Sequence, residues 1–364
     1  MLATEERASV VSVSRGVPSV RTVVAILVVL LVAATLLSAL IGSVGIPVLA
    51  VFAIVLRELS GGTVGAACAS LATTPRECTI WTEIVWGGRM PAILVAAFAG
   101  SALALSGGSL QGTFRNPLCD PYLLGISSGA ALGASVVLTF DLATADQATL
   151  LPVFAFAGAL VPGLVVYAAA RRTRRAPETL VLTGVALSAF FSALLATFLF
   201  YNPSAGLQLS FWLLGNLQAE TWTRAGVLAG TVLVGGTLMA LSGRELSILQ
   251  LGTEVAESVG VDAGRHTRRL ILLSTVVTAV AVAFTGVIGF VGLVSPHVVR
   301  RLVGPDYRRV LAVSGLFGAL FLVVAWDLAQ EIIPPVTVPV GIPTAFVGAP
   351  FFLYLLYRKR PEGR

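Results

Sequence analysis

The chain has 364 residues and a formal net charge of +6, with 56% hydrophobic and only 12% charged residues. A soluble domain carries about 25% charged residues, so this composition excludes an ordinary soluble enzyme and indicates lipid as the solvent. The basic excess is typical of membrane-protein loops, where arginine and lysine set the orientation, and we expect no nucleic-acid partner.

Nine stretches without Asp, Glu, Lys or Arg cover most of the chain. In chain order they are 22–42, 90–110, 122–140, 151–170, 179–201, 225–243, 270–299, 310–326 and 338–357. Apolar stretches of about 18 or more residues are candidates for membrane-spanning helices, so the sequence predicts an all-α, polytopic membrane protein. The first stretch exceeds the apolar core of a signal peptide, about 7–15 residues, and is interpreted as the first span.

The seventh stretch is longer than the roughly 20 residues that one span needs. It contains Gly289, Gly292 and Pro296, which weaken or break helices, so it is either one long span or a span followed by a short helix. Division near Gly289 gives ten spans and places 20 of the 24 Lys and Arg residues in the cytoplasm, whereas nine spans place 12 on each side. The positive-inside rule therefore favours ten transmembrane helices with both termini cytoplasmic.

This count predicts one membrane domain, 22–357, between cytoplasmic tails at 1–21 and 358–364. The long extracellular loop 43–88 contains Cys68 and Cys78, ten positions apart. Because disulfides are permitted on the outer side of the membrane, we predict a bond between them, the alternative being two unpaired thiols.

The longest cytoplasmic loop is 244–269, and Gly252 and Gly260 divide it. Between them one helical face is apolar and the other is acidic: Val255, Ala256 and Val259 on the first, Glu254 and Glu257 on the second. This pattern favours short amphipathic helices outside the membrane, and a solvated connector is the alternative.

The chemistry that the chain lacks narrows its function. Its one lysine, Lys359, lies in the C-terminal tail, which excludes a P-loop for ATP. The two histidines have no zinc-binding spacing, and no ionisable residue lies mid-span, where proton or ion relays need one. We therefore expect no catalytic residue, no metal site and no cofactor bound by this chain.

Small residues recur every fourth position in the second predicted span: Ala96, Gly100, Ala104, Gly108 and Gly112. Such stripes allow helix backbones to approach closely in lipid. We interpret this stripe as packing within the chain rather than as a dimer face.

Four blocks of sequence carry a resemblance to a known family. They are GGSLQGTFRNPLCDPYLLGISSGA (107–130), SFWLLGNL (210–217), GVIGFVGLVSPHVVRRLVGPDYR (286–308) and PVGIPTAFVGAPFFLYLLYR (339–358). In this order they resemble the permease subunits of type II ATP-binding-cassette (ABC) importers, which take up ferric siderophores, haem and cobalamin (vitamin B12). The resemblance runs from about Arg89 to the end of the chain.

The resemblance implies an assembly. A second copy of the chain would form a homodimer around a translocation pathway, and two ATP-binding subunits, holding ATP and Mg²⁺, would bind at the cytoplasmic face. An extracellular substrate-binding protein would dock outside. The complex would lie in the plasma membrane of a bacterium or an archaeon.

The resemblance also implies roles for particular residues. The gate and pathway would include Arg115, Asn116, Pro117, Leu118, Ser188 and Ser192. Coupling to the ATPase would fall within 246–262, at Leu246, Leu249, Gly252, Glu254, Val255, Glu257 and Gly260. Docking of the binding protein would involve Arg89, Trp212 and Glu331, although residues 89–92 read Arg-Met-Pro-Ala where relatives often have Arg-Leu-Pro-Arg.

Two competing functions differ in what they require. An ATP-independent secondary transporter of a small solute would need a coupling-ion site, for which the spans offer no candidate. A scaffold would not need the glycine-divided cytoplasmic loop. The motifs do not distinguish cobalamin, siderophore and haem, so the chelate stays open.

Overall fold

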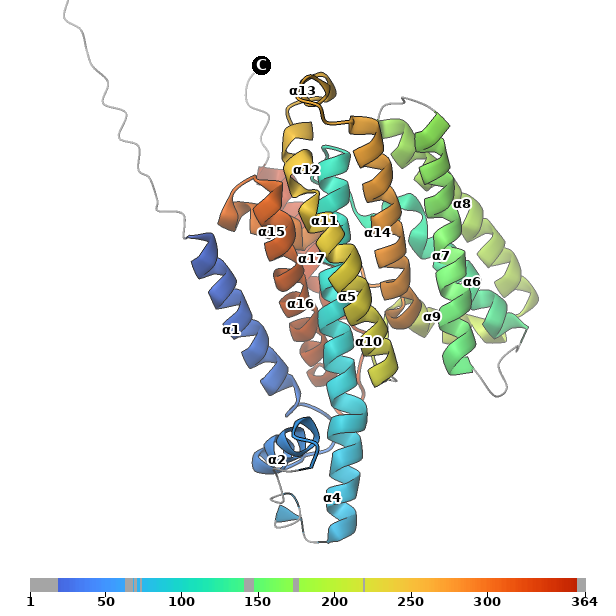
Figure 1. The fold of residues 1–364 in the computed structure, drawn as a ribbon. Helices are drawn as coiled ribbons and strands as arrows, with labels where there is room; N and C mark the ends of the chain where they lie inside the picture. Colours follow the sequence, from blue (N-terminus) through green and yellow to red (C-terminus); the bar gives the residue numbers. More distant parts are fainter. Residues whose placement is uncertain are drawn as a thin grey trace, which may run out of the picture.

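The computed structural model describes residues 19–62, 68, 71–72, 74–140, 147–172, 177–218 and 220–358, and these form a bundle of helices (Figure 1). Within these ranges the one extended pairing is an isolated bridge between Ile333 and Val336. The predicted tails lie almost entirely outside the described residues. The all-α prediction is confirmed for the described part of the chain.

Nineteen helical elements lie in the described part of the chain. In chain order they are α1 (Val20–Ser38), α2 (Val48–Leu59), α4 (Pro75–Thr82), the π-helix η1 (Glu83–Arg89), α5 (Met90–Thr113), the 3₁₀ turn η2 (Pro121–Leu124), α6 (Ile126–Thr139), α7 (Gln147–Arg172), α8 (Pro177–Tyr201), α9 (Ser204–Leu213), α10 (Trp222–Thr231), the π-helix η3 (Val232–Gly236), α11 (Thr237–Leu241), α12 (Gly243–Leu249), α13 (Thr253–Ser258), α14 (Ala263–Thr285), α15 (Val291–Val303), α16 (Tyr307–Glu331) and α17 (Gly341–Arg358).

Seven helical stretches in the described part of the chain are long and apolar enough to cross a membrane. They are Val20–Ser38, Arg76–Thr113, Thr149–Arg171, Thr179–Tyr201, Trp222–Leu241, Ala263–Thr285 and Tyr307–Glu331. The other three predicted spans coincide with the shorter helices α6, α15 and α17. The expected interruption of 270–299 is present, because α14 ends at Thr285 and α15 begins at Val291.

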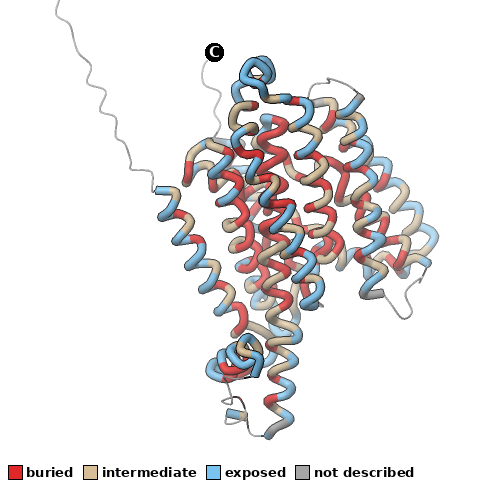
Figure 2. The backbone as a smooth tube through the Cα atoms, viewed as in Figure 1, coloured by how far each residue is buried: buried red, intermediate tan, exposed pale blue. Residues whose placement is uncertain are grey.

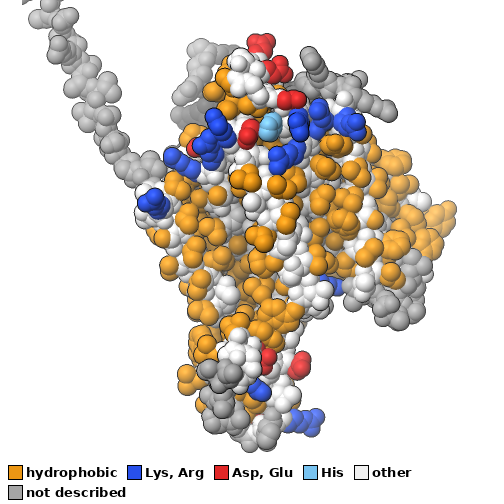
Figure 3. All heavy atoms as spheres, viewed as in Figure 1, with side chains coloured by type: hydrophobic (Ala, Val, Ile, Leu, Met, Phe, Trp, Pro, Cys, Tyr) orange, Lys and Arg blue, Asp and Glu red, His pale blue; other side chains and the backbone are white. Residues whose placement is uncertain are grey.

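The two ends of the bundle differ in charge. The start of α1, the end of α17 and the pair α12–α13 lie toward one end, while α2 and α4 lie at the other (Figure 1). Arginines gather near α12 and α13, and an apolar belt covers the middle (Figure 3). This distribution matches the side that the positive-inside rule assigns to the cytoplasm.

Helix α5 is the centre of the bundle and is buried along most of its length (Figure 2). A Cβ atom on Gly100 would collide with the Gly318 carbonyl of α16, and one on Gly107 would collide with the Gly292 backbone of α15. The small-residue stripe therefore packs within the chain, as predicted, since only glycine permits these backbone contacts.

One helix extends far beyond the bundle at the end that carries α2 and α4 (Figure 1). Residues Arg76–Thr113 form 38 continuous helical residues through α4, η1 and α5, or about 57 Å at 1.5 Å per residue. Because the apolar core of a bilayer is about 30 Å thick, the α4 end projects outside it. Cys78 of α4 is bonded there to Cys68, and α2 lies nearby (Figure 1).

Candidate functional site

The proposed gate residues form a compact turn where α5 ends. The turn is closed by Arg115 N–H donating to the Gly112 carbonyl (3.3 Å) and by Asn116 N–H donating to the Gln111 carbonyl (3.1 Å). Arg115 takes a left-handed backbone conformation with φ 51°, which is uncommon for residues other than Gly and Asn. The Asn116 side chain accepts from Leu118 N–H at 2.9 Å, and the turn is exposed at the end of the bundle that carries α12.

A buried glutamine joins this turn to α15. Gln111 is 1% exposed, and its Nε2 donates to the Gly292 carbonyl at 3.2 Å. Pro296, four residues after Gly292, lies inside α15 and has no N–H to offer that carbonyl. Gln111 supplies the missing donor, and its Oε1 accepts from Arg300, which also donates to the Tyr307 hydroxyl at 3.1 Å.

A tyrosine next to the turn holds the interruption between α14 and α15. The Tyr122 hydroxyl donates to the Ile288 carbonyl (3.0 Å) and accepts from the Ile288 N–H (3.1 Å). Non-helical backbone at membrane depth needs such partners because lipid offers none. The same segment is held from the outer side, where Asn216 N–H donates to the Thr285 carbonyl at 2.9 Å.

The two serines proposed for the pathway lie on α8 and differ in their surroundings. Ser188 Oγ donates to the Gly184 carbonyl at 2.9 Å and faces Gly125, which directly follows η2. Ser192 is exposed one turn further along. The structure thus brings Ser188, but not Ser192, next to the segment that follows the gate turn.

The proposed coupling residues divide between α12 and α13, with glycines at both turns. Gly252 (φ 115°) and Gly260 (φ 83°) have positive φ values, where glycine carries no Cβ penalty. Leu246 and Leu249 are buried, whereas the side chains on α13 are exposed apart from Ala256; the exposed ones include Glu254, Val255 and Glu257. Figure 1 shows α13 as a knob above the bundle.

A cavity of 460 Å³ separates the gate turn from the α13 side. Phe114 and Arg115 line it together with Thr253, Glu257 and Arg268. The structure therefore places Arg115 of the gate turn around the same space as four residues of the coupling region, Leu249, Thr253, Glu257 and Asp262.

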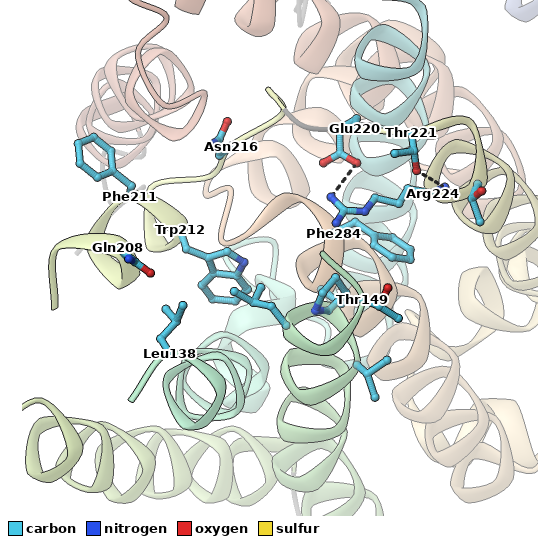
Figure 4. Close-up of a pocket in the computed structure, with 15 residues that line it drawn as sticks. Leu138, Thr149, Gln208, Phe211, Trp212, Asn216, Glu220, Thr221, Arg224 and Phe284 are labelled. Carbon is cyan, nitrogen blue, oxygen red and sulfur yellow. Dashed lines mark hydrogen bonds and ion pairs between the residues drawn. The ribbon is translucent and has the colours of Figure 1, made fainter. Parts of the chain in front are cut away.

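Trp212 lines an outer cavity of 770 Å³ between α7, α9, α10 and α14 (Figure 4). Its indole Nε1 is buried without a hydrogen-bond partner among the described residues. Glu220 faces Arg224 in the same cavity, with Oε2 3.5 Å from the guanidinium, and Arg224 lies 5.8 Å from the centre of the Phe284 ring. Trp212 is thus a cavity residue rather than part of a flat outer surface.

The buried carboxyl of Glu220 should make the stability of the folded chain depend on pH. Burial raises the pKa of its carboxyl to about 7, although Arg224 opposes the shift. Because the pKa of this carboxyl is higher in the folded chain than in the unfolded chain, where it is near 4.5, proton binding favours the folded state. This contribution to stability is complete below about pH 4.5 and is lost as pH rises through about 7. We expect the melting temperature in detergent to fall between about pH 5 and pH 8, and E220Q to flatten that slope; an unchanged slope in E220Q would contradict this.

Arg89, proposed for docking, is engaged inside the chain. Its guanidinium donates to the carbonyls of Ala39 (3.1 Å), Leu40 (3.4 Å) and Val44 (2.6 Å), just past the end of α1. Carbonyls at a helix C-terminus lack partners and attract cations. A Cβ atom on Gly42 would lie 2.7 Å from the guanidinium, so this cradle needs glycine.

Replacing Arg89 with alanine should therefore loosen α1 by about 1.5–3 kcal/mol, the usual range for a hydrogen-bonded charged group. R89K should recover only part of this loss, because an ammonium cannot reach three carbonyls as a planar guanidinium does. The measurement is thermal unfolding in detergent with R76A, an exposed arginine on α4, as the control. Equal melting temperatures for R89A and R76A would refute the capping role.

The third docking candidate, Glu331, is exposed at the end of α16. Arg89 and the neighbouring Gln330 line one small outer cavity of 280 Å³, whereas Trp212 lines the separate outer cavity. Arg89 and Trp212 therefore line different cavities, and the docking role of all three residues stays a prediction.

Several residues with structural roles at these sites were not singled out from the sequence: Gln111, Tyr122, Glu220, Gln250, Arg300 and Tyr307. Pro296 was the signal in the sequence that could have pointed to Gln111. A proline inside a helix leaves the carbonyl four residues earlier, here that of Gly292, in need of another donor. Nothing in the sequence pairs Gln111 with Gly292, 181 residues away.

A sequence model of the FecCD transport family matches residues 26–358. The cobalamin import system permease protein BtuC of Halobacterium salinarum is 44% identical over 270 residues, covering 74% of this chain and 72% of that protein. The hemin transport system permease protein HmuU of Yersinia pestis is 37% identical over 318 residues, covering 85% of this chain and 94% of that protein. An Fe(3+)-citrate import system permease of Bacillus subtilis, YfmE, is 38% identical over 269 residues, covering 74% and 80%.

A solved structure described as an inward-facing conformation of a metal-chelate type ABC transporter is similar in fold. It superposes with a TM-score of 0.75 at 27% identity, covering 93% of this chain and 99% of that one.

Proposed function

The chain belongs to the FecCD transport family, as a permease subunit of an ABC importer, and we propose that it carries a metal chelate, either cobalamin or a ferric siderophore or haem, into the cell. The observation that carries the proposal is the family match over residues 26–358. The chain itself would perform no chemistry, and ATP with Mg²⁺ would be hydrolysed on partner subunits.

Ten transmembrane helices per chain are part of the proposal. Seven helical stretches qualify by length and composition, and the apolar helices α6 and α17 together with α15 would complete the count. The arginines near α12 and α13 support cytoplasmic termini (Figure 3), and the family match supports the plasma membrane of a bacterium or an archaeon. Cysteine labelling from outside the cell at Ile80 and Leu251 tests this, with reaction expected only at residue 80.

The partners follow from the same assignment. A second copy would complete the pathway, two ATP-binding subunits would contact α13, and an external binding protein would deliver the chelate. Exposed apolar side chains on α8, including Phe190, Phe200 and Tyr201, need lipid or a partner surface to cover them. With Arg89 capping α1, docking of the binding protein would rely on other outer residues, Glu331 among them.

Uptake into proteoliposomes tests the function. The chain is reconstituted with its ATP-binding subunits and binding protein and given cyanocobalamin, hemin or ferric citrate in turn. Uptake of one chelate that requires ATP supports the proposal and identifies the substrate. Uptake by this chain without the ATP-binding subunits would instead support the alternative, an ATP-independent secondary transporter.

Replacing Gly252 with a bulky residue should uncouple ATP hydrolysis from uptake. Its φ of 115° is strained for any side chain, and such strain typically costs about 1–3 kcal/mol, so α13 should shift relative to α12. A Cβ atom added to Gly252 would meet no neighbouring atom within 4 Å, so the rest of the bundle should be unaffected. The ratio of chelate transported to ATP hydrolysed is measured for G252L against G230A, and an unchanged ratio would count against the coupling role.

A further inference from the structure

The short helix α12 is seated on the ends of α5 and α16. Leu246 is fully buried, and a Cβ atom on Gly112 would lie 3.0 Å from its side chain and 2.7 Å from the Tyr307 ring. A Cβ on Gly243 would lie 2.7 Å from the Arg308 Cα atom. Packing this close leaves α12 little freedom to slide over either helix.

Two side chains of α12 and its C-cap add hydrogen bonds to this seat. Ser247 Oγ accepts from Tyr307 N–H at 2.9 Å and lies 3.1 Å from Asp306 Oδ1, to which it donates. Gln250 Nε2 donates to the Gly112 carbonyl at 2.8 Å and to the Leu246 carbonyl at 3.2 Å. The two hydrogen bonds of Ser247 hold α12 to the start of α16, and the bond from Gln250 to Gly112 holds it to the end of α5.

The bond from Gln250 reaches the gate turn directly. The Gly112 carbonyl that accepts from Gln250 also accepts from Arg115 N–H at 3.3 Å. The position of this one carbonyl therefore depends both on α12 and on the first residue of the turn.

Helix α13 has no comparable contact with the turn. The 460 Å³ cavity lies between Arg115 and the side chains of Thr253 and Glu257, and Ala256 is the one buried residue that the structure assigns to α13. A displacement of α13 can therefore reach the gate turn through α12, whereas a direct push would first have to close the cavity.

We propose that Gln250 is a positioning residue that transmits movement of the ATPase-coupling helices to the gate turn, through the shared Gly112 carbonyl. This inference rests on the proposed function. In the transport cycle, α13 binds the ATPase subunit and α12 moves together with α13. The end of α5 then moves with α12 and displaces Arg115. Loss of the Gln250 amide leaves α13 able to dock but weakens the link between docking and the gate turn.

Hydrogen–deuterium exchange of the full chain in detergent tests the link without any partner. In Q250A the amides of Arg115 and Asn116 should exchange about fivefold faster, the factor that corresponds to one hydrogen bond of about 1 kcal/mol. The isosteric Q250E keeps the size but replaces the donor with an acceptor, and should give at least the same acceleration. Q208A, an exposed glutamine of α9, is the control. Unchanged protection of the turn in both Gln250 variants would overturn the proposal.

The assembled importer supplies the second readout. Q250A should keep its ATP hydrolysis and its binding of the ATP-binding subunits, while chelate transported per ATP falls about fivefold, the same factor of one hydrogen bond. A parallel loss of ATPase binding and uptake would place Gln250 in docking and refute its positioning role. If the unmodified assembly transports none of the three chelates, the proposed function fails, while the exchange experiment still decides the link.

Discussion

Replacing Gln111 with leucine is expected to destabilise the chain by about 3–5 kcal/mol, the range for leaving a buried charged or hydrogen-bonded group without its partner. Leucine fits the space but offers no donor to the Gly292 carbonyl and no acceptor to Arg300. The free energy of unfolding in mixed micelles, or the melting temperature in detergent, measures the loss.

Two further variants identify the cause. Q111E keeps an acceptor for Arg300 and removes the donor to Gly292, so its loss should be intermediate. P296A restores an N–H four residues after Gly292, so Q111L should cost less in that background than in the unmodified chain, as a double-mutant cycle would show. Equal costs in both backgrounds would contradict the pairing of Gln111 with the carbonyl that Pro296 leaves without a donor.

Replacing Gly100 with valine should prevent stable folding, with a loss above about 4 kcal/mol, which is exceptional for one substitution. The new Cβ would collide with the carbonyl group of Gly318, and backbone of a central helix cannot rotate away as a side chain can. Because α5 packs on α14, α15 and α16, the displacement would spread through the bundle. The yield of monodisperse protein after detergent extraction measures this effect.

A matched glycine provides the control. Gly230 of α10 is exposed, with no atom within 4 Å of an added Cβ, so G230A should be neutral or gain up to about 1 kcal/mol in helix propensity. G100A should already be harmful, because the collision involves the Cβ atom itself. Normal yield and stability for G100A would show that α5 and α16 can separate at this point.

The sequence predicted those features that depend on local composition. Charge-free stretches located the main helices, and Gly289 with Pro296 predicted the interruption that lies at 286–290. The small-residue stripe predicted close packing of α5, which Gly100 and Gly107 confirm. The four motifs predicted the family, which the family match confirms.

Contacts between distant segments could not be predicted in the same way. Arg89 kept the position of the family's docking arginine, but nothing local showed that three carbonyls past the end of α1 would accept from it. Trp212, predicted for docking, lies in a cavity that residues of α7, α10 and α14 also line. These outcomes depend on which helices become neighbours, and a single sequence does not encode that in its periodicity. The roles assigned to Ser188, Ser192 and the gate turn stay predictions.

The uninterrupted helix Arg76–Thr113 has a use beyond its place in the fold. About 20 of its 38 residues suffice to cross the apolar core, and the part before α5 buries Trp81 and Val85 in the cluster that also contains Ile54 of α2. Single cysteines at three of its exposed positions before α5, namely 76, 80 and 83, should all react with a water-borne reagent, because this part exceeds the length that crosses the apolar core. The reactive position nearest to α5 would then bound the lipid surface from the water side.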